Sequence, residues 1–244
     1  MNVLVVDVGG TNVKVLRTPP AVPGEDAPLK LASGPDLTAS AMAAAVRHAT
    51  AGWAYDAVSV GYPGPVRGGR PAAEPHNLGP GWVDFDYDAA FGRPVRLIND
   101  AAMQALGSYE GGRMLFLGLG TGLGSALVVD GVVQPLELAH LPYRHGRTYE
   151  EYVGVAGLER LGLKRWRKRV FDVVRRLAEA LQADYVVLGG GNVKKLDTLP
   201  EGARRGENAN AFEGGRRLWE MPAFPVAAQR PAAGADAGPP AAAH

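Results

Sequence analysis

Cysteine is absent from the 244 residues of this chain. Without thiols, the chain can form no disulfide, thiolate nucleophile, iron–sulfur cluster or cysteine-based zinc site. Long hydrophobic runs are missing as well. The longest, such as Val3 to Val6 and Ala126 to Val129, have the length of a strand, far below the ~18 residues that a bilayer requires.

The first residues also lack the features of a secretory leader. The opening MNVLVVDVGGTN has no basic region ahead of its apolar run, and Asp7 comes too early for the hydrophobic core of a leader. We therefore expect a cytoplasmic protein with no membrane partner.

A strong net charge is the next absence. The 26 Lys and Arg residues nearly balance the 25 Asp and Glu residues, giving a formal net charge of +1. Such balance provides no global attraction to nucleic acid or to anionic membranes, and we expect neither as a partner. A composition that is 46% hydrophobic fits one large globular domain or two small ones at this length.

Strands alternate with helices in the predicted chain, and two strand pairs enclose glycine turns. Residues 2–17 predict a hairpin that turns at 9–11, and residues 113–129 repeat the pattern of strand, glycine turn and strand. This repeat suggests a weak internal duplication. Because hairpins give antiparallel pairs and strand–helix–strand units give parallel ones, we expect an α/β fold with two lobes and mixed sheets.

Three helices are predicted with some detail. The alanine-rich segment 39–51 has Thr38 or Ser40 as its candidate N-cap. Residues 99–109 predict a second helix, which is capped at its start by an Asn-Asp pair. Residues 163–181 predict a long basic helix with one apolar face.

The division into lobes follows from these elements. We expect a first lobe over residues 1–115 and a second over 116–221, with the last helix free to return to the first lobe. The segment 222–244 consists mostly of Ala, Pro and Gly and predicts a disordered tail.

Glycine-rich turns follow three of the predicted strands, at residues 7–11, 118–125 and 189–192. Glycine lets the backbone approach a phosphate and direct its N–H groups at it, and Thr11 and Thr121 add hydroxyl groups. One such turn is more often a simple tight turn, but three favour a nucleotide or polyphosphate site. Neither a Gly-Lys-Ser/Thr P-loop nor a G-x-G-x-x-G sequence opening a helix is present, which disfavours P-loop NTPases and standard dinucleotide enzymes.

Two aspartates stand where predicted strands end. Asp7 lies beside the first glycine turn and could hold Mg²⁺ against phosphate oxygens, or merely cap the turn. Asp100 could act as a general base toward a substrate hydroxyl, or simply as a helix N-cap, which is the commoner role on local evidence. Asn99 beside it could bond a second hydroxyl.

Glu137, His140 and Glu150 form a further polar group within a short stretch of chain. Two carboxylates and an imidazole are suitable partners for hydroxyl groups. A lone histidine is more often structural than a ligand. With His145 nearby a metal site is conceivable, but the spacing matches no standard zinc signature.

The strongest charge feature is the basic run 164–169, which Arg175 and Arg176 extend. Such a run is usually a solvated helix face, although it could bind a polyanion. Trp166 among the arginines suggests a nucleic-acid surface, but the apolar positions of the same helix indicate that one face belongs to a core.

Taken in order, these motifs resemble the ROK family of sugar kinases, whose fold is the two-lobed actin-like ATPase (ribonuclease H-like) fold. Residues 7–14 resemble the first phosphate motif of the family, 118–125 the second and 189–192 the motif on the adenosine side. The sugar side matches in sequence order at 61–66, 77–82, 99–101, 137–140 and 150–152. Each motif is weak alone, but their joint order is specific.

The resemblance implies a role for many individual residues. It makes Asp100 the catalytic base. The implied sugar-binding residues are Gly64, Asn77, Asn99, Asp100, Glu137, His140 and Glu150. The implied phosphate and nucleotide site comprises Asp7, Gly9, Gly10, Thr11, Asn12, Lys14, Gly120, Thr121, Gly122, Gly190, Gly191 and Asn192, with Mg²⁺ near Asp7, directly or through water. A homodimer is also implied.

Two departures from the family pattern matter. The cysteine-rich zinc motif of many members is missing, so we expect no zinc, and position 139 is Ala where the family has Gly. The bacterial polyphosphate glucokinases share the loss of these cysteines and resemble this chain in the Trp-containing basic segment. Polyphosphate is therefore a candidate donor beside ATP.

The main hypothesis is phosphoryl transfer from ATP or polyphosphate to the 6-hydroxyl of glucose, with mannose as the competing sugar. The alternative is a non-catalytic sugar sensor of the same fold. A repressor would need a DNA-binding domain ahead of the first strand, which begins by Val3. An actin-like ATPase without a sugar substrate is disfavoured by the group Glu137, His140 and Glu150.

Overall fold

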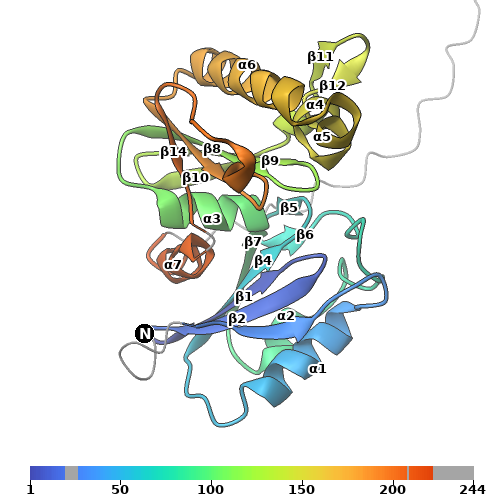
Figure 1. Ribbon diagram of the computed structural model, residues 1–244. Coiled ribbons are helices and arrows are strands. Elements are labelled where there is room, and N and C mark those ends of the chain that lie inside the picture. Colours follow the sequence, from blue (N-terminus) through green and yellow to red (C-terminus); the bar gives the residue numbers. More distant parts are fainter. Residues whose placement is uncertain (20–26, 208, 222–244) are drawn as a thin grey trace, which may run out of the picture.

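Two five-stranded sheets with the same topology form the centre of the computed structural model, which describes residues 1–19, 27–207 and 209–221. The strand orders are β3-β2-β1-β4-β7 and β10-β9-β8-β13-β14 (Figure 1). In both sheets the first two pairings are antiparallel and the next two parallel. The duplication suggested by the two glycine hairpins thus extends over whole sheets, and the predicted mixed α/β architecture is confirmed.

The strand bounds follow the predicted hairpins closely. The first sheet consists of β1 (Val3–Val8), β2 (Asn12–Thr18), β3 (Leu29–Ala32), β4 (Ala57–Tyr62) and β7 (Val95–Asn99). The second consists of β8 (Arg113–Leu119), β9 (Leu123–Val129), β10 (Val132–Leu136), β13 (Tyr185–Gly189) and β14 (Ala203–Arg205). Two short ribbons pair β5 (Val66–Arg67) with β6 (Arg70–Pro71) and β11 (Pro142–Arg144) with β12 (Arg147–Thr148).

The helices include each of those predicted. They are α1 (Ala39–Ala49), α2 (Tyr87–Phe91), α3 (Asp100–Ser108), α4 (Glu150–Val153), α5 (Val155–Leu161), α6 (Leu163–Leu181) and α7 (Asn210–Arg217), with 3-10 turns η1 (Leu138–His140) and η2 (Val193–Lys195). Of the two candidate caps for α1, Thr38 is the one used, since its hydroxyl accepts a hydrogen bond from the Ala41 N–H. The predicted tail 222–244 lies outside the described residues.

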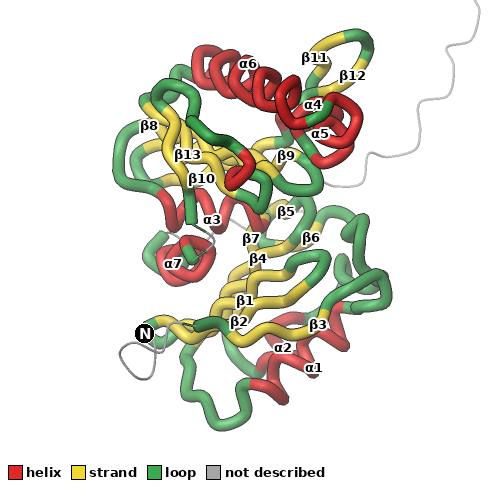
Figure 2. The backbone as a smooth tube through the Cα atoms, in the orientation of Figure 1, coloured by secondary structure: helices red, strands yellow, loops and turns green. Residues whose placement is uncertain are grey.

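Alternating strand residues decide which helices cover which face of each sheet. In β1, Val3 and Val5 pack with α3 and α7, whereas Leu4, Val6 and Val8 pack with α1 and α2. In β8, Met114 and Phe116 face α3, and the alternating residues Leu115 and Leu117 face α6. Helices α3 and α7 therefore lie between the sheets, while α1 and α6 cover opposite outer surfaces (Figure 2).

A pair of glycines brings α3 and α7 into backbone contact. A Cβ added at Gly107 would overlap the Asn210 carbonyl oxygen, and one added at Gly214 would overlap that of Met103. Arg217 donates from Nη1 to the carbonyl oxygens of Leu106 and Tyr109 at 3.1 and 2.9 Å, satisfying acceptors at the end of α3. The end of the chain that the structure describes thus holds α3 in place.

The basic helix α6 contributes to the core of the second sheet. Trp166 is fully buried, and its Nε1 donates to the Val153 carbonyl at 2.8 Å. The suggestion that this tryptophan marks a nucleic-acid surface is therefore wrong, because its ring is not accessible to bases. In the residues that the structure describes, none of the helices has the length and apolar character to span a bilayer.

Candidate active site

The three glycine turns lie at the ends of strands in both sheets, and two of them pack directly on each other. Gly190 has a φ of +84°, and a Cβ there would lie 2.5 Å from the Leu119 carbonyl oxygen. Asn192 donates from Nδ2 to the Gly120 carbonyl at 2.9 Å. These contacts join the second turn, residues 118–125, to the third, residues 189–192.

The first glycine turn connects β1 to β2 and is closed by its own hydrogen bonds. The Gly9 N–H donates to the Asn12 carbonyl at 3.1 Å, and the Ser33 hydroxyl donates to the Gly9 carbonyl at 2.6 Å. A Cβ at Gly10 would meet the Asn77 Cβ at 3.7 Å. Asn77, predicted to bind sugar, therefore lies against the predicted phosphate turn.

Asp7 and Lys14 face each other across this hairpin. Asp7 is buried, and its carboxylate lies 3.4 Å from the Lys14 Nζ. Burial raises the pKa of Asp7, and the neighbouring ammonium group opposes that rise. Within the described residues no group of three or more His, Asp or Glu side chains could hold a metal ion. A Mg²⁺ ion held here would therefore depend on Asp7 together with donor phosphates and water, which suits a cation that keeps several waters.

Asp100 is the first residue of α3, and the N-cap is its neighbour. The Asn99 Oδ1 accepts the Ala102 N–H at 3.1 Å, whereas the Asp100 Oδ1 accepts the adjacent Ala101 N–H at 2.7 Å. Of the Asn-Asp pair predicted to cap this helix, Asn99 is therefore the cap, and the alternative interpretation of Asp100 as a simple N-cap is wrong. Asp100 is left with acceptor capacity for another group.

Burial, together with the negative charges of Asp7 and Glu137, raises the pKa of Asp100 to about 7. The hydrogen bond from the Ala101 N–H acts in the opposite direction. Because both carboxylates act on Asp100, the three acidic groups share one region, to which β1, α3 and the segment after β10 each contribute a residue. A carboxyl group that titrates near neutral pH is suited to accept a proton.

The other residues predicted to bind sugar include two contacting pairs, Asn99 with Gly64 and His140 with Glu137. The Asn99 Nδ2 donates to the Gly64 carbonyl at 3.1 Å, which ties the strand end to the loop after β4. His140 and Glu137 approach each other at 3.7 Å, with 71% and 61% of their side chains exposed. His140 is thus no buried structural histidine, and it is free to meet a ligand.

Glu150, which is predicted to bind sugar, contacts the second glycine turn. Its Oε2 accepts the Leu123 N–H at 3.2 Å, and a Cβ at Gly122 would overlap this carboxylate. Gly122 therefore leaves room for the glutamate beside the predicted phosphate turn. The metal site considered for His140 and His145 is not formed within the residues described.

Two features near the site were not evident in the sequence. Glu74 accepts the Trp82 N–H with both carboxylate oxygens at 3.1 and 3.2 Å, closing the loop that carries Asn77. A cavity of about 710 Å³ lies beside α7, and its cationic side chains are Lys14, Lys30 and Arg216. Its walls come from segments far apart in the chain, so no local sequence motif predicts it.

The basic face of α6 is directed away from Asp100. Its apolar residues pack on the face of the second sheet opposite to α3, so the sheet separates its charges from the acidic region. Arg167 is paired with Asp197, and Arg175 and Arg176 are paired with Asp172. These ion pairs favour the solvated structural role for this helix.

Comparison with known proteins agrees with this architecture. No family model matches the chain. Polyphosphate glucokinase of Mycobacterium tuberculosis (strain ATCC 25177 / H37Ra) is 28% identical over 214 residues, covering 79% of this chain and 78% of that protein. Inorganic polyphosphate/ATP-glucomannokinase from Arthrobacter sp. strain KM superimposes with a TM-score of 0.73 at 24% identity, covering 90% of this chain and 99% of that one.

A ROK family glucokinase from Streptomyces griseus, solved with glucose and AMPPNP, superimposes with a TM-score of 0.66 at 18% identity. This match covers 89% of the present chain and 99% of the glucokinase. The chain has the fold of the ROK sugar kinases. The actin-like architecture implied by the sequence motifs is therefore confirmed. In sequence, the chain is similar to a polyphosphate glucokinase.

Proposed function

We propose that this chain is a sugar kinase that transfers a phosphoryl group from polyphosphate or ATP to the 6-hydroxyl of glucose, and that mannose is its second sugar. The observation that carries the proposal is the position of Asp100, a carboxyl group of raised pKa at the start of α3 beside Asp7. The similarity to a polyphosphate glucokinase supports the same reaction class.

In this mechanism Asp100 accepts the proton of the sugar hydroxyl as its oxygen attacks the terminal phosphoryl group. Asp7 would hold Mg²⁺, directly or through water, and the ion would neutralise charge on the donor phosphates. The turns at 9–12, 120–122 and 190–192 would orient the donor through N–H groups other than those of Gly9, Gly120 and Asn192, which donate within the turns. Because phosphoryl transfer depends mainly on positioning and electrostatics, these groups suffice for it.

The sugar hydroxyls would be recognised by polar groups around Asp100. In the proposal these are Gly64, Asn77, Asn99, Glu137, His140 and Glu150. We propose that each sheet belongs to one lobe and that the lobes close on the sugar and exclude water. The boundary predicted between residues 1–115 and 116–221 falls inside β8 (Arg113–Leu119), which belongs to the second sheet. The proposed assembly is a homodimer, which light scattering on the purified chain measures directly.

The pH dependence of kcat/KM for glucose tests the role of Asp100. A base with a pKa of about 7 is roughly 10% ionised at pH 6 and 90% at pH 8, so we expect kcat/KM to rise about ninefold over this interval. The rise occurs with increasing pH because the ionised form is the active one. A profile that is flat from pH 6 to pH 8 would contradict the assignment.

The cavity beside α7 is the proposed path of the polyphosphate chain, in place of the basic helix. Lys14 connects the two places, since it lines the cavity and also contacts Asp7. Lys30 of β3 lies opposite Lys14 of β2 in the strand register and lines the same cavity. A linear polyanion leaving the phosphate turns along this face would meet both ammonium groups.

We therefore expect Lys30→Ala to raise the KM for polyphosphate roughly two- to fivefold, the size of one partly exposed charge contact, with little change for ATP. The matched control is Arg175→Ala, which removes a cation from the outer face of α6. Polyphosphate use should also weaken with salt more steeply than ATP use in the native chain. If Arg175→Ala raises the KM for polyphosphate more than Lys30→Ala does, polyphosphate binds along the basic helix α6 instead.

A further inference from the structure

A small hairpin separates His140 from Glu150. It consists of β11 and β12, and its base is closed by a hydrogen bond from the Tyr149 N–H to the Leu141 carbonyl at 3.1 Å. His140 immediately precedes this base and Glu150 immediately follows it. The position of the hairpin therefore decides how far these two side chains lie from each other.

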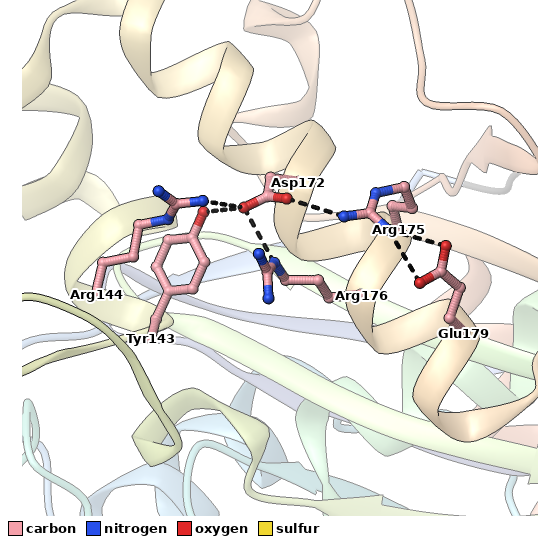
Figure 3. A network of polar contacts seen from close by, with 6 residues as sticks. All are labelled: Tyr143, Arg144, Asp172, Arg175, Arg176 and Glu179. Atoms are coloured by element: carbon pink, nitrogen blue, oxygen red, sulfur yellow. Dashed lines mark hydrogen bonds and ion pairs between the residues drawn. The ribbon is translucent and has the colours of Figure 1, made fainter.

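Asp172 of α6 accepts contacts from two side chains of the hairpin, and Arg176 of the same helix lies over the Tyr143 ring at 5.8 Å. The Tyr143 hydroxyl donates to the Asp172 Oδ2 at 2.5 Å, and the Arg144 Nη2 lies 3.2 Å from the same oxygen (Figure 3). The Tyr143 ring stacks on Tyr149 at 5.1 Å and meets the edge of Tyr152 at 5.0 Å. The side chain that reaches α6 thus also packs on Tyr149 and Tyr152, which lie before and after Glu150 in the chain.

Asp172 is itself firmly placed. Arg175 and Arg176, on the next turn of α6, contact its two oxygens at 3.3 and 3.1 Å. Although burial raises its pKa, the hydrogen bonds from Tyr143, Arg176 and Arg144 hold that pKa at about 2. The carboxylate is therefore ionised throughout the neutral range, and the 19-residue helix that carries it packs in one apolar cluster with the leucines of β8.

We propose that Tyr143 and Asp172 are positioning residues for sugar binding: the contact between them places His140 and Glu150. The inference rests on the proposed function. A two-stranded hairpin of this size has little stability alone, so its orientation depends on the contacts that attach it. Without the attachment, ordering His140 and Glu150 around a sugar would carry an entropic cost.

The test is Tyr143→Phe, which keeps the aromatic stacking and removes only the hydroxyl. We expect the KM for glucose to rise about fivefold to tenfold, in the range of a typical lost hydrogen bond, while kcat stays within about twofold. The KM for the phosphoryl donor should not change. Asp172→Asn, which keeps the side-chain shape, should raise the same KM.

Glu179→Gln is the matched control on the same helix. Glu179 pairs with Arg175 at 2.9 Å, as Asp172 does, and that pair does not include the hairpin. The control should leave the glucose KM unchanged. Two results would overturn the positioning role, provided that the native enzyme is active. One is a Tyr143→Phe variant with the native KM for glucose, and the other is a variant in which kcat and both KM values fall in parallel.

Hydrogen exchange separates failure of the inference from failure of the proposed function. The Tyr149 amide, which closes the hairpin base, should exchange about tenfold faster in Tyr143→Phe than in the native chain. Unchanged exchange at Tyr149 would overturn the inference whether or not the chain phosphorylates sugar. A native chain without kinase activity that still shows the faster exchange would overturn the proposed function and keep the attachment.

Discussion

Asp100→Asn should lower kcat by about 10²- to 10⁴-fold, the contribution of a general base, and leave the glucose dissociation constant within about threefold. The amide matches the carboxylate in shape and can still accept the Ala101 N–H, so α3 should keep its start. It cannot take a proton from the sugar hydroxyl. Rates come from a coupled assay, and binding comes from calorimetry with glucose alone.

The control for this variant is Asp130→Asn, the same chemical change at a distant turn. Asp130 adopts a φ of +50°, which asparagine also tolerates, so stability and turnover should both stay at native values. Native turnover in Asp100→Asn would remove Asp100 from the mechanism. Loss of glucose binding together with turnover would assign it to sugar binding instead.

Gly214→Ala should lower the free energy of unfolding by at least about 2 kcal/mol and the melting temperature by about 4–8 °C. Alanine improves helix propensity by about 1 kcal/mol, but a methyl group here would overlap the Met103 carbonyl of α3. Backbone cannot yield as a flexible side chain does, so the clash outweighs the gain. Thermal unfolding followed by circular dichroism measures the change.

Gly34→Ala is the matched glycine control. A Cβ at Gly34 meets nothing within 4 Å, so this variant should unfold at or above the native temperature. Because Asp100 opens α3, the folded fraction of Gly214→Ala should also lose activity as α3 shifts. A Gly214→Ala protein with native stability would show that α3 and α7 are not in the close contact described.

The sequence predicted those parts of the site that depend on local pattern. Residues 2–17 form the hairpin expected from their apolar run and glycine turn, and residues 163–181 form the expected helix. The sequence assigned the N-cap to the Asn99-Asp100 pair and could not choose between its members, because both residue types cap helices well. Side-chain geometry alone distinguishes the cap from the first helical residue.

The parts that could not be predicted depend on long-range packing. An amphipathic pattern shows that α6 buries one face, but not which side of the sheet receives it, so its charges suggested a donor path that the sheet blocks. The Tyr143–Asp172 bond joins positions 29 residues apart, and no motif links them. The cavity that Lys30 lines is likewise formed by β2, β3 and α7, which only the folded chain brings together.

Phosphorus NMR of the native chain with glucose, Mg²⁺ and either polyphosphate or ATP tests the central claim most directly. The account predicts a new phosphomonoester signal, coupled to the C6 protons of glucose, with at least one donor. Asp100→Asn should give no such signal over the same time. A folded native chain that binds glucose and forms no phosphomonoester with either donor would contradict the kinase assignment and favour the non-catalytic sugar sensor.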